Sequence, residues 1–196
     1  KVTPQDINFG KQLELILKPL SVGQLSENKI TLGSFPAFVK EKSLLASIEN
    51  ESNAVLMNAE NVGETMYAGP GAGAKPTSNS VLSDIIDIAT GKIFDYQKFV
   101  ESPLASSFEN FSCDHYLRFI VSDEPGVVAK ISTVLAANNL SIDNLIQNEL
   151  DREDDAIPLV IVISNSKEKI MQNTISDLQK LSEVKNSISH IRILDI

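Results

Sequence analysis

Residues 113–196 carry an order of apolar patterns that few folds can accommodate. Segments with the composition of strands and segments with helical periodicity follow one another as strand 115–121, helix 127–137, strand 141–149, strand 158–164, helix 167–183 and strand 188–196. This β-α-β-β-α-β order predicts an antiparallel sheet with two helices on one face. We expect the other face to be free to pair with another surface, and the acidic residues 151–155 to form a hairpin turn.

The turn between the first strand and the first helix of this region carries the pattern of a ligand site. Residues 123–127 read Asp-Glu-Pro-Gly-Val. Pro125 sets the backbone φ angle, and Gly126 allows a tight turn. The helix that follows presents backbone N–H groups without intrahelical partners, which can bind a carboxylate. A plain turn is the alternative, and it would be favoured if this Pro-Gly pair stood outside such a β-α-β-β-α-β unit.

Residues 116–131 and 140–147 resemble the opening and the second strand of an ACT domain. ACT domains are regulatory domains that bind amino acids, usually at interfaces between paired copies. The resemblance implies that Asp123 and Gly126 line the ligand pocket and that Ser141 faces it from across an interface. Several relatives have Asn at the position of Ser141, and many ACT domains serve assembly without a ligand. Amino-acid binding and assembly alone therefore both stay open.

The first part of the chain combines short strands with one helix. Extended segments are expected at 13–20, 29–32, 36–39, 53–58 and 64–68, and a helix at 77–90 that Thr77 or Ser78 caps and Gly91 ends. Residues 69–77 read Gly-Pro-Gly-Ala-Gly-Ala-Lys-Pro-Thr and connect a strand to that helix. Alternate glycines let a backbone approach a ligand closely. The loop matches neither a dinucleotide fingerprint nor a phosphate-binding loop, so a merely flexible loop is the alternative.

Residues 62–77 and 80–89 resemble the end of the catalytic domain of homoserine dehydrogenase. The fold class is then α+β: the C-terminal part of a mixed-sheet catalytic domain followed by a ferredoxin-like βαββαβ ACT domain. We expect the catalytic part to span 1–92, a linker 93–112 and the ACT domain 113–196. Since the chain begins at Lys1 with what reads as a helix inside a domain, we expect it to be part of a longer protein.

The resemblance implies an oxidoreductase that interconverts homoserine and aspartate 4-semialdehyde, in threonine and methionine biosynthesis, with NADP or NAD as cofactor. It implies that Gly73, with Gly71 and Gly69, lies against the nicotinamide end of the cofactor. The family's lysine acid/base and substrate-binding carboxylates lie upstream of the matched region, so no catalytic residue is assigned. We expect the isolated chain to bind NADP weakly or not at all and to be inactive.

The composition limits which partners the chain can bind and indicates the cellular compartment in which it is expected. The formal net charge of −9 argues against nucleic acid and against anionic membrane surfaces. The lone Cys113 cannot form an internal disulfide, which fits the cytoplasm. No third group in the sequence would orient Cys113 and His115 for nucleophilic catalysis. His115 and His190 lack partners at metal-ligand spacing, so no bound metal is expected.

Three interpretations of the whole chain remain at this point. The first is a homoserine dehydrogenase fragment that forms a homo-oligomer, a dimer by sheet and ACT pairing, and is inhibited by threonine as end product. The second is a stand-alone amino-acid-binding module. The third is the regulatory end of another enzyme of amino-acid biosynthesis, such as a serine-pathway dehydrogenase or an aspartate kinase. Only the first gives the glycine loop a role.

Overall fold

The computed structural model describes residues 2–26, 28–92, 104–147 and 156–196. In chain order the elements are α1 (Pro4–Gln12), β1 (Leu15–Ser26), β2 (Lys29–Lys40), η1 (Leu44–Ser47), β3 (Ser52–Ala59), β4 (Gly63–Pro70), α2 (Ala74–Ala89), β5 (Leu104–Ala105), η3 (Phe108–Asn110), β6 (Ser112–Ser122), α3 (Val127–Ala137), β7 (Ile142–Gln147), β8 (Ala156–Lys167), α4 (Glu168–Leu178) and β9 (Ser189–Leu194). Within these ranges, no helix combines the length and the apolar character needed to cross a bilayer. The chain forms two compact units, one of residues 1–41 with 104–196 and one of residues 42–103.

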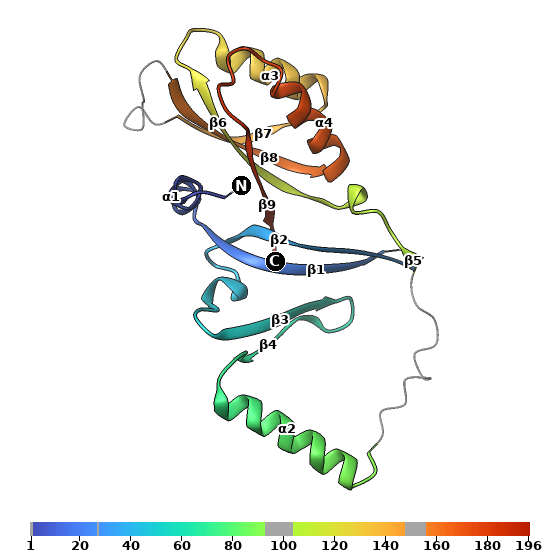
Figure 1. Ribbon diagram of the computed structural model, residues 1–196. Coiled ribbons are helices and arrows are strands. Elements are labelled where there is room, and N and C mark those ends of the chain that lie inside the picture. The colour runs from blue at the N-terminus through green and yellow to red at the C-terminus, as the bar shows by residue number, and fades with distance from the viewer. Residues whose placement is uncertain (1, 27, 93–103, 148–155) are drawn as a thin grey trace. The chain divides into compact units, whose positions relative to one another are not determined.

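The larger unit contains the predicted β-α-β-β-α-β arrangement, from β6 to β9. Its strands lie in the order β9-β6-β8-β7, and the pairs β6–β8, β6–β9 and β7–β8 are antiparallel. Helices α3 and α4 cover one face, as Figure 1 shows. The core between helices and sheet includes Phe119, Ile131, Ile161 and Met171, each fully buried. The fold class expected from the sequence is confirmed, while the acidic residues 151–155 lie outside the described residues.

The opposite face of this sheet, which we expected to be available for pairing with another surface, is partly covered by an earlier part of the same chain. Helix α1 packs on it through Phe9, in a cluster that also contains Phe38, Tyr116 and Ile191. The Phe38 and Tyr116 rings meet edge to face with their centroids 5.2 Å apart. The sequence of α1 alone does not predict this contact, because Phe9 is the only large apolar residue of the helix that is buried.

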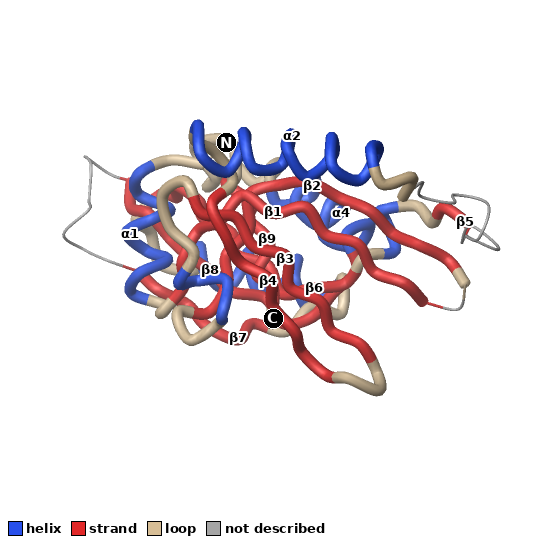
Figure 2. Tube along the Cα trace, turned by 90° about the horizontal axis from the view of Figure 1, so that it is seen from below, coloured by secondary structure: helices blue, strands red, loops and turns tan. Residues whose placement is uncertain are grey.

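The β1–β2 hairpin extends the same sheet. Its strands pair antiparallel over their full length, from Leu15 opposite Lys40 to Ser26 opposite Lys29. Strand β2 then pairs in parallel with β9, where Ala37 lies opposite Arg192, so that β1, β2 and β9 run side by side (Figure 2). The two segments predicted at 29–32 and 36–39 are thus one continuous strand.

Part of the predicted linker has regular structure. Residues 104 and 105 form β5, which pairs with the start of β2, and Phe108–Asn110 form a 3-10 helix. Phe111 is buried beside Ala37 and Leu194. Residues 93–103 of that linker lie outside the described residues.

The smaller unit contains the β3–β4 hairpin and α2. The hairpin pairs from Ser52 opposite Pro70 to Ala59 opposite Gly63. Helix α2 begins at Ala74, three residues earlier than predicted, because Pro76 is tolerated within the first helical turn, where its missing N–H is not needed. Its N-cap is Gly73, so neither Thr77 nor Ser78 caps it. None of its side chains is buried, and its apolar residues Val81, Leu82, Ile85, Ile86 and Ile88 are all at least half exposed.

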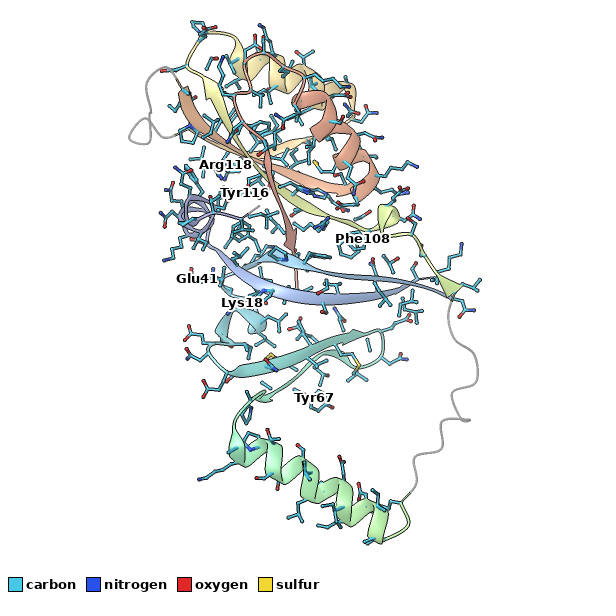
Figure 3. The ribbon with its side chains drawn as sticks, in the orientation of Figure 1. Lys18, Glu41, Tyr67, Phe108, Tyr116 and Arg118 are labelled. Carbon is cyan, nitrogen blue, oxygen red and sulfur yellow. The ribbon has the colours of Figure 1, made fainter. Side chains whose placement is uncertain are left out.

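A buried carboxylate fastens α1 to the sheet. Asp6 is fully buried and accepts a 2.7 Å hydrogen bond from Nε of Arg118 on β6. Its oxygens also accept hydrogen bonds from the Tyr116 hydroxyl at 3.2 Å, the Ser189 hydroxyl at 3.1 Å and the Thr3 backbone N–H at 2.8 Å. Figure 3 shows Tyr116 and Arg118 on the part of β6 that faces α1. Burial raises the pKa of Asp6, but the hydrogen bonds from Arg118 and Thr3 outweigh it and hold the pKa below its ordinary value.

The substitution Asp6→Asn is expected to lower the free energy of unfolding by about 3–5 kcal/mol, because it leaves the buried Arg118 guanidinium without its counter-charge. Urea unfolding at neutral pH measures the difference. The control is Asp177→Asn, which removes an exposed ion pair with Lys180 and should cost less than about 1 kcal/mol. Equal losses for the two variants would contradict the stabilising role of Asp6.

The contribution of Asp6 to the free energy of unfolding should also depend on pH, in the direction that follows from its lowered pKa. The carboxylate is favoured in the folded state, so its contribution is complete above the pKa of an unfolded aspartate, about 3.9. It is lost as the pH falls through the lower folded-state pKa. The stability difference between the wild type and Asp6→Asn should therefore shrink on acidification below about pH 4.

Candidate functional site

The glycine loop lies between the end of β4 and the start of α2, and its three glycines face different constraints. All three are exposed. Gly73 has φ 119° and ψ 156°, a conformation that is essentially restricted to glycine. A Cβ on Gly71 would lie 2.0 Å from the Asn53 side chain of the neighbouring strand. The backbone at Gly73 therefore requires glycine, whereas a side chain at Gly71 would have to displace the exposed Asn53 side chain.

Gly69 differs because nothing within its own unit requires a glycine there. A Cβ built on Gly69 meets no atom within 4 Å, and its backbone pairs regularly with Asn53 in the β3–β4 ladder. A side chain at this position would point into open space. If a glycine is needed at Gly69, the need comes from something that lies against the loop from outside.

The N-terminus of α2 adds an electrostatic property to the loop. The first backbone N–H groups of a helix lack intrahelical acceptors and carry partial positive charge. No side chain caps α2, so its first turn is open to an acceptor from elsewhere. A Gly-rich backbone followed by an uncapped helix start suits the close approach of a polar or anionic ligand.

A second candidate site is a hollow of about 380 Å³ at the start of α3. Asp123, Gly126 and Val128 line it, with Gln147 from the end of β7. Gly126 is the N-cap of α3 in the left-handed conformation, with φ 93°. The structure thus brings the predicted Asp123 and Gly126 together at one helix N-terminus. Gln147 is a lining residue that the sequence analysis did not select, although its place at the end of the predicted second strand could have indicated it.

Ser141 is not among the residues that line this hollow. It is exposed and directly precedes β7, whereas Gln147 ends that strand. Ser141 can contribute to such a hollow only from a second copy of the chain, which is how the prediction framed it.

A third cluster joins two histidines that lie 75 positions apart in the sequence. His115 on β6 and His190 on β9 approach through Nδ1 and Nε2, which are 2.9 Å apart. Glu168, the first residue of α4, completes a group whose ligand atoms all lie within 4.8 Å of one another. Antiparallel pairing of β6 and β9 brings the two rings together, so spacing along the sequence could not reveal this group.

Burial governs the protonation of this cluster. It lowers the pKa of both imidazoles, that of His190 to about 3, where the neighbouring His115 contributes further. For Glu168, burial raises the pKa, but the hydrogen bonds from Arg192 outweigh it and the pKa is lowered. Both rings are therefore neutral and the carboxyl group is ionised at neutral pH.

The neighbouring thiol is not a nucleophile. Sγ of Cys113 lies 3.9 Å from Nε2 of His115, and burial raises the pKa of the thiol to about 12. Since the thiolate is the reactive form, this group is inert at neutral pH. This environment agrees with the expectation from the sequence that Cys113 and His115 are not arranged for nucleophilic catalysis.

Comparison with known proteins assigns both parts of the chain to families. Residues 1–86 match the profile of a family described as Homoserine dehydrogenase, and residues 115–183 match the profile described as ACT domain. Homoserine dehydrogenase of Helicobacter pylori is 33% identical over 98% of this chain and 46% of that protein. Homoserine dehydrogenase of Neisseria gonorrhoeae is 34% identical over 98% of this chain and 46% of that protein.

Solved structures agree in fold. A homoserine dehydrogenase from Thiobacillus denitrificans superposes with a TM-score of 0.84 at 28% identity, over 99% of this chain and 46% of that one. The chain therefore spans a little under half the length of the relatives it matches. Both parts of the chain match in the order in which these relatives carry them, so the chain is similar to the C-terminal part of a homoserine dehydrogenase, in which the end of the catalytic domain is followed by an ACT domain.

Proposed function

We propose that the protein to which this chain belongs oxidises homoserine to aspartate 4-semialdehyde, and reverses this reaction, with NADP or NAD. The support is the similarity to homoserine dehydrogenases together with the geometry of the glycine loop. Hydride transfer needs a cofactor, a bound substrate and an acid/base group, and this chain supplies only part of that set. Residues of the other part would hold the dinucleotide and the substrate amine.

The glycine loop would lie against the nicotinamide end of the cofactor. Gly71 and Gly73 fix the backbone path, and Gly69 leaves open space for a flat ring beside the main chain. The uncapped start of α2 would face polar groups of the same ligand. The apolar side chains of α2 would then be covered by the remainder of the catalytic domain, since a soluble protein rarely leaves a patch of this kind in water.

The hollow at the start of α3 would bind an amino-acid effector. The Asp123 carboxylate is an acceptor for an ammonium group, and the N-terminus of α3 suits a carboxylate. Threonine is our choice of effector, because it is an end product of the pathway that the family serves. Inhibition would operate by linkage between the effector site and the cofactor site.

Assembly as a homodimer and a cytoplasmic location complete the proposal. Strands β1 and β7 are the two edges of the six-strand path of the main sheet, and edge strands offer unpaired backbone groups to a second copy. The exposed Leu25 and Leu32 on the β1–β2 hairpin supply apolar area for such pairing. The alternative function is an ACT-type regulatory module of another amino-acid biosynthesis enzyme, which would leave the glycine loop without a role.

The substitution Gly69→Ala tests the cofactor role of the loop. In the complete gene product it should raise KM for NADP about tenfold or more, because a methyl group would occupy the space proposed for the ring. The thermal midpoint should not change, since a Cβ at Gly69 meets no atom of its own unit. Gly23→Ala, on β1, is the matched control and should leave KM for NADP unchanged. Wild-type cofactor kinetics in Gly69→Ala would contradict the placement of the nicotinamide.

A threonine titration tests the effector site separately. Threonine at 100 times its dissociation constant should stabilise the chain by about 2.7 kcal/mol, which a thermal-shift assay detects. Asp123→Asn should abolish most of this shift, because it removes the charge that pairs with the ammonium group. The control is Asp143→Asn on β7, outside the residues that line the hollow, which should keep the full shift. Loss of threonine response in both variants, or in neither, would reject Asp123 as the effector ligand.

A further inference from the structure

The cluster of His115, His190 and Glu168 has no part in the proposed reaction or in the effector site. It lies under the start of α4, whereas the effector hollow lies at the start of α3. Glu168 and His115 are fully buried, and His190 is partly buried. Buried imidazoles and carboxylates are costly unless their polar atoms are satisfied, so the partners of each atom indicate what the cluster can bind.

The hydrogen bonds assign the tautomers of the two rings. Nε2 of His115 lies 3.1 Å from the backbone carbonyl of Ser166, which can only accept, so this nitrogen carries the hydrogen. Nδ1 of the neutral His115 ring is therefore a bare lone pair. It accepts the Nε2–H of His190 at 2.9 Å. Metal-binding histidines are commonly oriented in this way: one ring N–H donates to a backbone carbonyl, and the other ring nitrogen is unprotonated.

The carboxylate of Glu168 is held in a fixed orientation. Arg192 donates from Nε to Oε2 at 2.9 Å and from Nη2 to Oε1 at 2.5 Å, and Gln172 donates to Oε1 at 3.1 Å. Oε2 thus keeps a second lone pair available. The Arg192 guanidinium itself is stacked over the Phe35 ring, with 4.5 Å between its central carbon and the ring centroid. This contact and the ion pair fix Arg192 beside the cluster.

We propose that Nδ1 of His115, Nε2 of His190 and one oxygen of Glu168 bind a divalent transition-metal ion such as Zn²⁺. Two imidazole nitrogens and one carboxylate oxygen form a ligand set that suits Zn²⁺, Co²⁺ and related ions, with a fourth position for water. The ion would join β6, β9 and the first turn of α4. It would be structural, because the cluster lies at the start of α4 whereas the effector hollow lies at the start of α3.

Binding requires the three ligand atoms, which now lie within 4.8 Å of one another, to come together around one ion. Tetrahedral coordination with metal–nitrogen bonds of about 2.0–2.1 Å places two ligand nitrogens about 3.3 Å apart. The two ring nitrogens, now 2.9 Å apart, would separate by about 0.4 Å. The hydrogen on Nε2 of His190 would move to Nδ1 of the same ring, so the imidazole stays neutral and no net proton is released. Arg192 reduces the negative charge of the site. The affinity of the site for a divalent ion is therefore expected to be lower than that of a site whose carboxylate has no cationic partner.

The test uses Co²⁺ as a spectroscopic probe on the whole chain, prepared without a histidine tag. One equivalent of Co²⁺ should give the intense visible absorption of a tetrahedral complex, and Zn²⁺ should displace it. This chain has only two histidines, so every imidazole signal in its NMR spectrum comes from this cluster. Both sets of ring signals should shift on addition of Zn²⁺, and the thermal midpoint should rise.

Variants separate this site from adventitious binding to acidic surface groups. His190→Gln should lower Co²⁺ affinity by roughly 100-fold or more, because it removes a ligand. Glu168→Gln should also lower it, and Asp177→Asn on the exposed face of α4 should leave it unchanged. Unshifted imidazole signals at stoichiometric Zn²⁺ would overturn the proposal. So would Co²⁺ binding that survives in His190→Gln. The NMR result on the unsubstituted chain decides the matter even if a variant fails to fold.

Discussion

The ion pair between Asp6 and Arg118 is the contact on which the larger unit depends. It joins the first helix of the chain to a strand that lies more than a hundred residues later. Arg118 would be a severe cost in a buried sheet without a carboxylate beside it, and Asp6 would be equally costly without Arg118. Tyr116 and Ser189 add hydrogen bonds from two strands, so a single carboxylate fixes α1, β6 and β9 together. The part that belongs to the catalytic domain and the ACT domain are therefore packed against each other through a specific polar contact as well as through Phe9 and Phe38.

Periodicity predicted the β-α-β-β-α-β order of the ACT domain well, because each of these elements has a clear apolar face. Val127, Ile131 and Leu135 recur at helical spacing on α3, and the strands β6 and β8 are rich in branched residues. The contact of α1 with the sheet was missed, since its key residue is an aspartate that reads as a solvated capping residue. The start of α2 was placed too late because Pro76 reads as a helix breaker, although the first turn of a helix tolerates it.

The candidate sites also differ in how far the sequence alone could predict them. Asp123 and Gly126 are neighbours in the sequence, so a turn motif was enough to select them, and the structure places both at one hollow. The three glycines were selected as a group, yet the structure distinguishes them: the backbone at Gly73 requires glycine, a Cβ at Gly71 would meet the Asn53 side chain, and a Cβ at Gly69 would meet no atom within 4 Å. His115, His190 and Glu168 come from three elements and meet only through strand pairing and the position of α4. A local sequence motif can therefore reveal a site such as that of Asp123 and Gly126. The cluster of His115, His190 and Glu168 can be recognised only in the three-dimensional structure.

The parallel pairing of β2 with β9 affects how such a protein could change during evolution. Residues 1–86 match one family and residues 115–183 another, yet β2 and β9 share a hydrogen-bonded ladder. Recombination at the boundary between the two families would exchange the regulatory module without β2. The pairing of β2 with β9 would then be lost, and the backbone groups of both strands would be exposed. A transferable module would have to include the β1–β2 hairpin and α1. The unit that recombination can move intact is thus larger than the unit that sequence families define.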